Sequence, residues 1–390
     1  MTDLFEAKST LPDTEALDPE DTSGGPEGVK PWDPGKIRIT TKSFSLRDVV
    51  DQIADAEIDL SPDFQREYVW QPRQRTRLIE SILLGIPLPA FYFNQSGDGT
   101  YQVVDGVQRL STIALFMSDG HRLSGVDLEY LTNLDGLTYS EIDPASSRRF
   151  RSTQIVVHVI EPQTPDEVKY DIFSRVNTLG SPLSAQEIRH AMSKDRSRRF
   201  IGHLAESQAF DKATEFQYWR RKEGEAVRDS GRMTNRELAL RFCAFRSSGI
   251  EEYRQHPSLD AFLIDFTRRI DGASPRPALS DDQLHVLAKD FERAMVNAHT
   301  VLAAAAFRRW PVGQDRRGPI NRAVFEAQAN ALADYQLEQL LPCKEAIVAT
   351  FRSAFEDPEY LRSVTVSTGD AARVAFRLGA TRHLLASALQ

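Results

Sequence analysis

The sequence predicts an α+β N-terminal domain followed by an all-α C-terminal domain. The first observation is that strand-like apolar runs mix with capped helical segments up to about residue 195. The second is that nearly every later segment has helical periodicity. The third is a length of 390 residues, which suits two or three domains. We therefore expect a leader over residues 1–36, a mixed domain over 37–195 and a helical domain over 196–390.

The composition excludes several classes of protein. Residues 1–36 are acidic and rich in proline and glycine, which predicts a disordered leader rather than a signal peptide. No apolar run approaches the roughly 18 residues that a membrane helix needs. Cys243 and Cys343 are the only cysteines and lie far apart, so neither a disulfide framework nor a cysteine-based zinc site is indicated, which fits a cytoplasmic protein. A net charge of −8 argues against nonspecific coating of nucleic acid, but it leaves room for a local basic groove.

The mixed domain has clear helix and strand signals. Residues 37–41 alternate as a strand does, and Ser45 is placed to cap the helix that follows. Residues 71–85 predict a helix with Pro72 in its first turn and a glycine at its end. A strand, a Gly-rich turn and a second strand predict a hairpin over 89–105. Further along, the pattern predicts a strand over 153–161 and helices over 164–180 and 184–193.

The stretch VVDGVQRLST, residues 103–112, turns from a buried strand into a helix. A helix start has unpaired amides that attract anions, Gly106 permits a close approach, and Arg109 can grip a phosphate with two donors. Asp105 could hold a divalent cation, polarise water or cap the helix, and Gln108 could orient water or contact a base. The alternative is an ordinary turn in which Asp105 caps the helix and Arg109 is a surface residue.

A second cluster is SPDFQREYVWQP, residues 61–72. Its aromatic residues, Tyr68 and Trp70 among them, could stack on a base while Gln65 and Arg66 pair with a phosphate. Equally, Trp70 could belong to the core with Arg66 as its salt-bridged neighbour.

A third cluster, residues 173–191, contains two capped helices that meet at a Gly-Ser-Pro turn. Glu187 fits the capping box of Ser184, whereas Arg189 and Asn177 have no such structural duty. The cluster also contains Arg175 and Gln186.

Taken together, the three clusters resemble the N-terminal domain of the GmrSD-type modification-dependent restriction proteins, a family with a ParB/sulfiredoxin-like fold. Its hallmarks are an early QR-x-Y-x-W, a central DGQQRL-T and a later F-x-R-x-N-x-x-G-x-x-L-x-x-Q-E-x-R. The resemblance covers roughly residues 45–195. The matching residues are Gln65, Arg66, Tyr68, Trp70, Asp105, Gly106, Gln108, Arg109, Leu110, Thr112, Phe173, Arg175, Asn177, Gly180, Leu183, Gln186, Glu187 and Arg189.

The resemblance implies a site that binds and hydrolyses a nucleoside triphosphate, with Mg²⁺ as its candidate metal. Asp105, Gln108 and Arg109 would be catalytic. Val107 departs from the family, which has glutamine there, so either this position points away from the pocket or catalysis is weakened while binding survives. The other nucleotide-binding residues would be Gln65, Arg66, Tyr68, Trp70, Gly106, Arg175, Asn177, Gln186, Glu187 and Arg189.

Many relatives carry a C-terminal HNH nuclease, but the eight histidines here are scattered and none stands in a suitable context. We therefore expect a DNA-associated NTPase of antiphage defence that lacks its own nuclease domain, with a separately encoded nuclease or ATPase as a candidate partner. Oligomeric state stays open. The alternatives are a non-enzymatic ParB-like adaptor and a DNA-nicking nuclease. The candidate DNA contacts are Arg196, Arg198, Arg199, Arg220, Arg221, Arg308 and Arg309.

Overall fold

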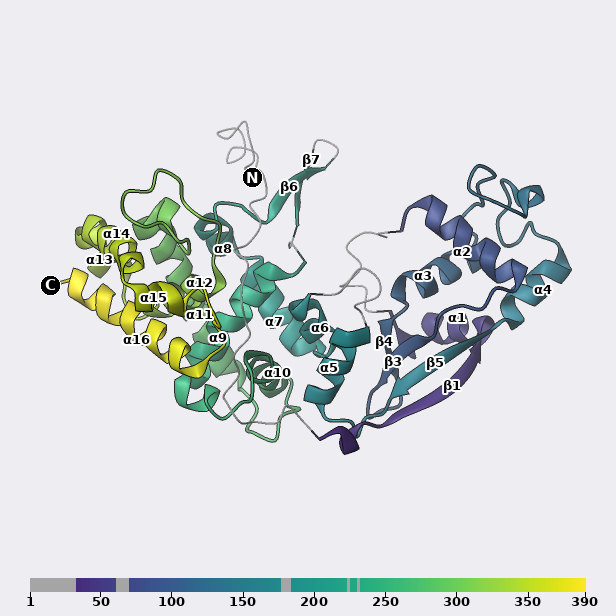
Figure 1. The fold of residues 1–390 in the computed structure, drawn as a ribbon, viewed down its shortest axis with the longest axis horizontal. Helices are drawn as coiled ribbons and strands as arrows, with labels where there is room; N and C mark the ends of the chain where they lie inside the picture. Colours follow the sequence, from purple (N-terminus) through teal and green to yellow (C-terminus); the bar gives the residue numbers. More distant parts are fainter. Residues whose placement is uncertain (1–32, 61–69, 177–183, 223–224, 230–231) are drawn as a thin grey trace. The chain divides into compact units, whose positions relative to one another are not determined.

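The computed structural model describes residues 33–60, 70–176, 184–222, 225–229 and 232–390 (Figure 1). The chain divides into two compact units, a mixed unit that ends at Leu183 and a helical unit that runs from Ser184 to Gln390. The predicted order of a mixed region followed by a helical region is confirmed. Among the described residues, no helix is both long and apolar enough to cross a bilayer.

The mixed unit is built on a five-stranded sheet of order β1-β5-β3-β4-β2. The strands are β1 (Ile39–Ser45), β2 (Ile58–Asp59), β3 (Phe91–Gln95), β4 (Tyr101–Asp105) and β5 (Gln154–Ile160). The helices are α1 (Leu46–Ala54), α2 (Pro72–Leu84), α3 (Val107–Met117), α4 (Pro144–Ser152) and α5 (Asp166–Val176). β3 pairs antiparallel with β4 as the predicted hairpin and parallel with β5, while β1 pairs antiparallel with β5. The two-residue strand β2 is not among the predicted elements.

The predicted capping residues start and end helices α1 and α2 as expected. Ser45 caps α1 by accepting a hydrogen bond from the backbone of Asp48 at 3.1 Å. Pro72 is the first residue of α2, and Gly85 ends that helix with a left-handed φ of 80°. α1, α2, α3 and α4 each bury apolar residues in a single core against the sheet, which includes Phe91, Phe93, Val103, Ile155 and Val157.

One acidic side chain on the buried face of α2 anchors a neighbouring loop. Glu80 is only 3% exposed, and its carboxylate accepts hydrogen bonds of 2.7 to 3.0 Å from the backbone amides of Glu129, Tyr130 and Leu131. Burial alone would raise the pKa of Glu80, but the three amides and Arg77 outweigh it and hold the pKa below its usual value of 4.5.

We expect Glu80→Gln to destabilise the mixed unit by roughly 1–3 kcal/mol, because the amide removes the charge and one of the two acceptor oxygens. The lowered pKa means that the carboxylate stabilises the fold at pH values above about 4.5 and that this contribution is lost as the pH falls below it. Urea unfolding at pH 7 and at pH 4 would measure this. A difference between wild type and variant that stays constant across that range would contradict it.

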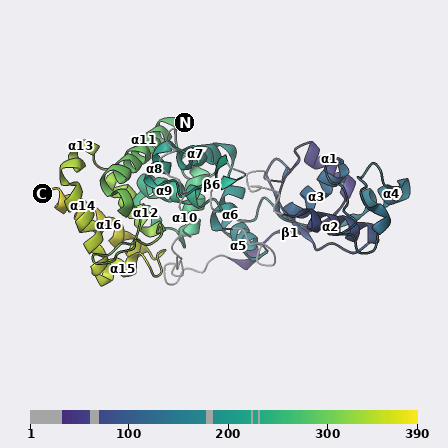
Figure 2. The same ribbon diagram turned by 90° about the horizontal axis from the view of Figure 1, so that it is seen from above.

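The helical unit contains eleven α-helices and one β-hairpin among its described residues. The helices are α6 (Ala185–Ala191), α7 (Asp195–Ala205), α8 (Gln208–Ala213), α9 (Thr234–Tyr253), α10 (Leu259–Ile270), α11 (Asp281–Asn297), α12 (Arg322–Leu332), α13 (Leu337–Leu340), α14 (Lys344–Ser353), α15 (Pro358–Ser363) and α16 (Ala371–Ala388). The chain divides at Ser184, earlier than the predicted boundary after residue 195, because α6 packs against α9 and α10. In both views (Figures 1 and 2), α12 lies among α9, α11 and α16, and it contacts all three.

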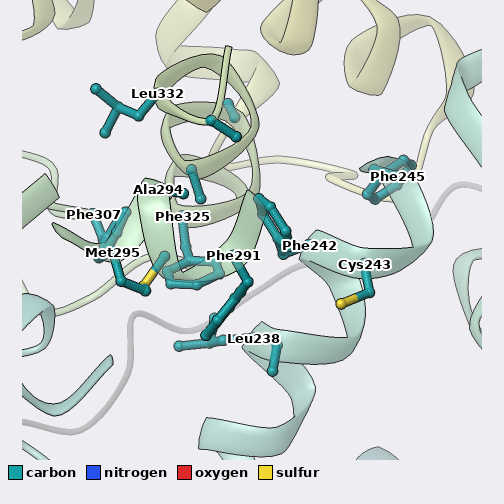
Figure 3. Close-up of a cluster of buried hydrophobic side chains, with 14 of the residues drawn as sticks. Leu238, Phe242, Cys243, Phe245, Phe291, Ala294, Met295, Phe307, Phe325 and Leu332 are labelled. Atoms are coloured by element: carbon teal, nitrogen blue, oxygen red, sulfur yellow. The ribbon is translucent and has the colours of Figure 1, made fainter. Parts of the chain in front are cut away.

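The core of this unit is aromatic. Figure 3 shows Phe242 of α9, Phe291 of α11 and Phe325 of α12 meeting in the cluster. The ring centroids of Phe242 and Phe291 are 5.2 Å apart, and those of Phe307 and Phe325 are 4.4 Å apart. All four rings are essentially inaccessible to solvent, as a helical bundle core of this size requires.

The hairpin was missed by the helical prediction for this half of the chain. β6 (Trp219–Lys222) pairs antiparallel with β7 (Glu225–Arg228). Arg228 holds the hairpin to α8 through Asp211, with hydrogen bonds of 2.5 and 2.6 Å, and its guanidinium lies 4.7 Å from the centroid of the Trp219 ring. From its sequence alone, this charge-rich segment resembles a solvent-exposed helix. The contacts of Arg228 with Asp211 and Trp219 that hold the hairpin are visible only in the structure.

Buried arginines and glutamates form a second connected feature of the helical unit, a network of ion pairs. Arg377 of α16 and Glu326 of α12 are both fully buried and directly hydrogen-bonded. Arg241 of α9 lies 3.6 Å from the other oxygen of Glu326 and donates to Glu237 at 2.9 and 3.1 Å. Arg322 reaches the same Glu237 at 3.1 Å. The network therefore joins α9, α12 and α16 through charges that water does not screen.

Candidate functional site

The turn between β4 and α3 is where the sequence predicts the catalytic residues. β4 ends at Asp105, Gly106 is the N-cap residue, and α3 begins at Val107. The register between β3 and β4 shifts at Tyr92/Phe93, so that Phe93 pairs with Val103 but Tyr92 pairs with Asp105. The extra residue, Val104, is a β-bulge, and such bulges re-aim the side chains that follow them.

Gly106 is required by two independent constraints. Its φ is 99°, a region that residues with a Cβ rarely adopt. A Cβ built on Gly106 would lie 2.2 Å from Cδ1 of Phe91, a fully buried ring at the start of β3. The backbone of this turn therefore lies directly against an aromatic ring, and no other residue type fits.

Asp105 and Arg109 form the polar part of the turn. Arg109 donates to Asp105 Oδ2 at 2.8 Å, to the carbonyl of Ala90 at 3.3 Å and to the carbonyl of Pro89, while its guanidinium packs 4.2 Å from the Phe91 centroid. The side chain of Arg109 is 13% exposed and that of Asp105 is 35% exposed. Burial lowers the pKa of Arg109, and the charge of Asp105 opposes that shift.

These contacts contradict both details of the ordinary-turn interpretation, while phosphate binding stays a prediction. Asp105 does not cap α3, since the N-cap is Gly106 and no side chain caps this helix. Arg109 is not a surface residue, because it holds the end of β4 to the start of β3. Arg109 is thus a positioning residue here, and direct contact with a phosphate would require it to exchange one of these partners.

The first amides of α3 have no hydrogen-bond partner among the described residues. The first intrahelical hydrogen bond runs from Leu110 N to the carbonyl of Gly106 at 2.9 Å, so the amides of residues 107–109 precede the helical ladder. Gln108 stands in the same turn, and its Oε1 is buried without a hydrogen-bond partner in the described parts of the chain. Within the described parts of the chain, the turn thus combines amide donors that have no partner, a partly exposed carboxylate and an amide oxygen that accepts no hydrogen bond.

Whether Mg²⁺ fits this turn depends on Asp105. Its Oδ2 is used by Arg109, and the structure gives Oδ1 no partner among the described residues. Mg²⁺ is usually held by one or two carboxylates together with substrate phosphates, so a single carboxylate oxygen next to an anion site suits it. No group of three or more histidine, cysteine, aspartate or glutamate side chains converges in the described part of the molecule.

Trp70 lies elsewhere on the mixed unit, in an open groove of about 650 Å³ along α2. Arg73, Arg77 and Ser81 line the same face of the helix, and Glu129 closes one side by pairing with Arg77. The indole is half-buried and packs against the core, which supports the interpretation of Trp70 as a core residue, and base stacking stays a prediction. The other three predicted residues of this cluster, Gln65, Arg66 and Tyr68, lie outside the described residues.

The third cluster is divided between the units. Arg175 ends α5 in the mixed unit, where it pairs with Asp171 at 2.9 Å. Asn177 lies outside the described residues. Gln186, Glu187 and Arg189 belong to the helical unit, which begins at Ser184.

Within the helical unit, these residues have structural partners. Glu187 completes the predicted capping box with Ser184 and pairs with Arg232 at 3.0 Å. Arg189 is 2% exposed, donates a hydrogen bond to Gln186 Oε1 at 2.9 Å, and contacts Asp260 and Glu237. Arg189 therefore joins the buried charge network, and its role in nucleotide binding stays a prediction.

The seven arginines predicted to contact DNA fall into two groups. Arg308 is 4% exposed and donates to Gly318 and Gln217, so it holds its own unit together, and a contact with DNA stays a prediction. Arg196 and Arg198 are bound to backbone carbonyls of neighbouring segments, and Arg309 is half-buried. The exposed members are Arg199, Arg220 and Arg221.

Sequence reasoning missed Phe91, which supports the turn, and Glu80, which anchors the loop at residues 129–131. The sequence places Phe91 only in a strand. In the structure its ring leaves no space for a Cβ at residue 106, and the guanidinium of Arg109 packs on it. Glu80 was passed over as well. Its signal was available, because it stands between apolar residues on the buried face of a predicted helix, where a lone charge needs a partner.

Comparison with known protein families agrees with this geometry. Residues 46–193 match the model described as GmrSD restriction endonuclease, N-terminal domain. No curated protein matches the chain significantly. The matched range contains β2 to β5, α1 to α5 and the complete turn at 105–109, which are the elements that build the candidate site. Residues 46–193 therefore form a domain of the GmrSD restriction endonuclease N-terminal family.

Proposed function

We propose that the mixed unit binds a nucleoside triphosphate at the 105–109 turn and hydrolyses it, within a DNA-directed restriction system that acts against phage. The family match supports the restriction setting. The observation that carries the nucleotide assignment is the backbone at Gly106, whose left-handed φ and missing Cβ leave the first amides of α3 uncapped beside Asp105. Such a helix start favours phosphate groups.

In this proposal each residue of the turn has a separate task. The amides of residues 107–109 bind phosphate oxygens, and Asp105 Oδ1 holds Mg²⁺ or the attacking water. Gln108 orients that water through its unsatisfied amide oxygen. Arg109 fixes the carboxylate of Asp105 and keeps its positive charge next to the phosphates.

The test is phosphate release from ATP, GTP, CTP and UTP in the presence of Mg²⁺. We expect Asp105→Asn to lower turnover roughly 10²-fold or more while the fold is retained, because the amide can neither take a proton nor neutralise a cation. Asp48→Asn is the matched control, since Asp48 is an exposed carboxylate in the first turn of α1 of the same unit. Equal turnover in the two variants would refute the role of Asp105.

A second candidate function is a nucleotide-binding adaptor without turnover. Two observations favour it: Val107 departs from the family motif, and the guanidinium of Arg109 is already engaged by protein groups. Nucleotide binding in equilibrium dialysis without release of phosphate would decide for the adaptor. A wild-type protein that neither binds nor hydrolyses any nucleotide would contradict both functions.

A further inference from the structure

Beside the 105–109 turn, one row of the sheet places polar and aromatic side chains in line. The strand registers pair Thr41 of β1 with His158 of β5, His158 with Tyr92 of β3, and Tyr92 with Asp105 of β4. Adjacent strands lie about 4.8 Å apart, so the His158 position is two strands, or about 10 Å, from Asp105. The row thus leads directly from the proposed phosphate site across the sheet.

Tyr92 and His158 do not belong to the apolar core. Tyr92 lies between Phe91 and Phe93, which are fully buried in the core. Its ring therefore projects from the opposite face of the sheet. His158 likewise alternates with the buried Val157 and Val159. Both rings are half-buried, and neither is needed to fill the core.

The two rings form a fixed pair. Their centroids are 5.0 Å apart with an interplanar angle of 47°. Thr41 Oγ1 is hydrogen-bonded to His158 Nδ1 at 3.0 Å, which sets the orientation of the imidazole. An aromatic surface held in one orientation lowers the entropy cost of stacking a planar ligand.

A polar group lies next to this pair. Asn94 is the next residue of β3 with the same orientation as Tyr92, and its Oδ1 is buried without a hydrogen-bond partner among the residues described. Such an acceptor is unfavourable unless a ligand or water supplies a donor. Nucleobases present N–H donors at their edges and flat faces for stacking.

We propose that Tyr92 and His158 are the base-stacking platform of the nucleotide site, with Asn94 placed to accept a hydrogen bond from the base edge. This inference rests on the proposed function, because it takes the phosphates to lie at the 105–109 turn. It adds that the protein binds a nucleoside triphosphate through its base as well as through its phosphates. The ligand class is therefore an aromatic nucleotide rather than any polyphosphate.

The experiment compares the affinities of full-length protein for ATP, GTP, CTP and UTP with its affinity for inorganic tripolyphosphate, by isothermal titration calorimetry. We expect Tyr92→Leu to weaken binding of the preferred nucleotide by about ten-fold or more and to leave tripolyphosphate binding unchanged. Tyr92→Phe keeps the ring and should bind as wild type does. Tyr130→Leu is the matched control, because Tyr130 is a 71% exposed tyrosine of the same unit outside this row.

Each outcome is decisive. Unchanged nucleotide affinity in both Tyr92→Leu and His158→Leu overturns the platform, as does an equal loss of nucleotide and tripolyphosphate binding. A wild-type protein that binds tripolyphosphate as tightly as any nucleotide also overturns it, yet leaves the phosphate site standing. A wild-type protein that binds neither ligand refutes the proposed function itself.

Discussion

Replacing Glu326 with glutamine is expected to lower the free energy of unfolding of the helical unit by roughly 3–5 kcal/mol, because it leaves a buried arginine without its anion. Arg377 is 0% exposed and has no route to water. Its other donors already serve the carbonyls of Ser363 and Thr368, at 3.1 and 2.8 Å, so it cannot turn to a new acceptor. Chemical denaturation at neutral pH measures the loss.

The control is an exposed ion pair of α16, the helix that contains Arg377. Arg382 of α16 pairs with Asp334 at 3.2 Å, but both side chains are more than a third exposed. Arg382→Ala should therefore cost no more than about 1 kcal/mol. If Glu326→Gln lowered the free energy of unfolding no more than Arg382→Ala does, the buried network would not stabilise the fold.

Acid should weaken the same network through Glu237. Burial alone would raise the pKa of Glu237, but Arg241, Arg322 and Arg189 lower it to about 2 from the usual 4.5. A lowered pKa means that this carboxylate stabilises the fold above pH 4.5 and that its contribution, on the order of 3 kcal/mol, is lost as the pH falls toward 2. Chemical denaturation should therefore show the helical unit becoming progressively less stable between pH 4.5 and pH 2.

Gly106→Ala is expected to destabilise the mixed unit by roughly 2–5 kcal/mol, and to abolish binding at the turn. About 1–2 kcal/mol comes from the left-handed backbone, and the rest from the clash of the new methyl group with Phe91. The melting temperature and the affinity for nucleotide should both fall.

Gly85→Ala separates the two causes. Gly85 has a φ of 80°, close to that of Gly106, but a Cβ there would meet nothing within 4 Å. Its alanine variant should therefore lose only the backbone term, about 1–2 kcal/mol. Equal losses at both glycines would mean that Phe91 moves aside easily, and that the close contact at the turn has no special role.

Local signals predicted the fold well where one residue decides the outcome. Ser45, Pro72 and Gly85 start or end helices through local properties: a side chain that caps the helix, a fixed φ and tolerance of a left-handed backbone. None of these properties depends on distant parts of the chain. The hairpin β6–β7 was not predicted, because its stability depends on Asp211 and Trp219, which contact Arg228 only in the folded unit.

The site was predictable in part for the same reason. The turn and its glycine follow from a local pattern, since Asp105 and Arg109 lie one helical turn apart. Their surroundings do not: Phe91 and Tyr92 come from the neighbouring strand β3, and the proposed platform residue His158 comes from β5. Residue spacing within one segment carries no information about such cross-strand neighbours, so the role of Arg109 as a positioning residue needed coordinates.

The bulge at Val104 has a consequence for any attempt to transplant this motif. If Val104 paired regularly instead of bulging, strict alternation would put Asp105 in register with Phe91 and send its carboxylate toward the apolar interior. A designer who grafts the DGVQRL hexapeptide onto another hairpin must therefore also reproduce this register, which keeps the carboxylate on the same face of the sheet as Tyr92. The smallest portable unit includes Val104 and the strand it bends.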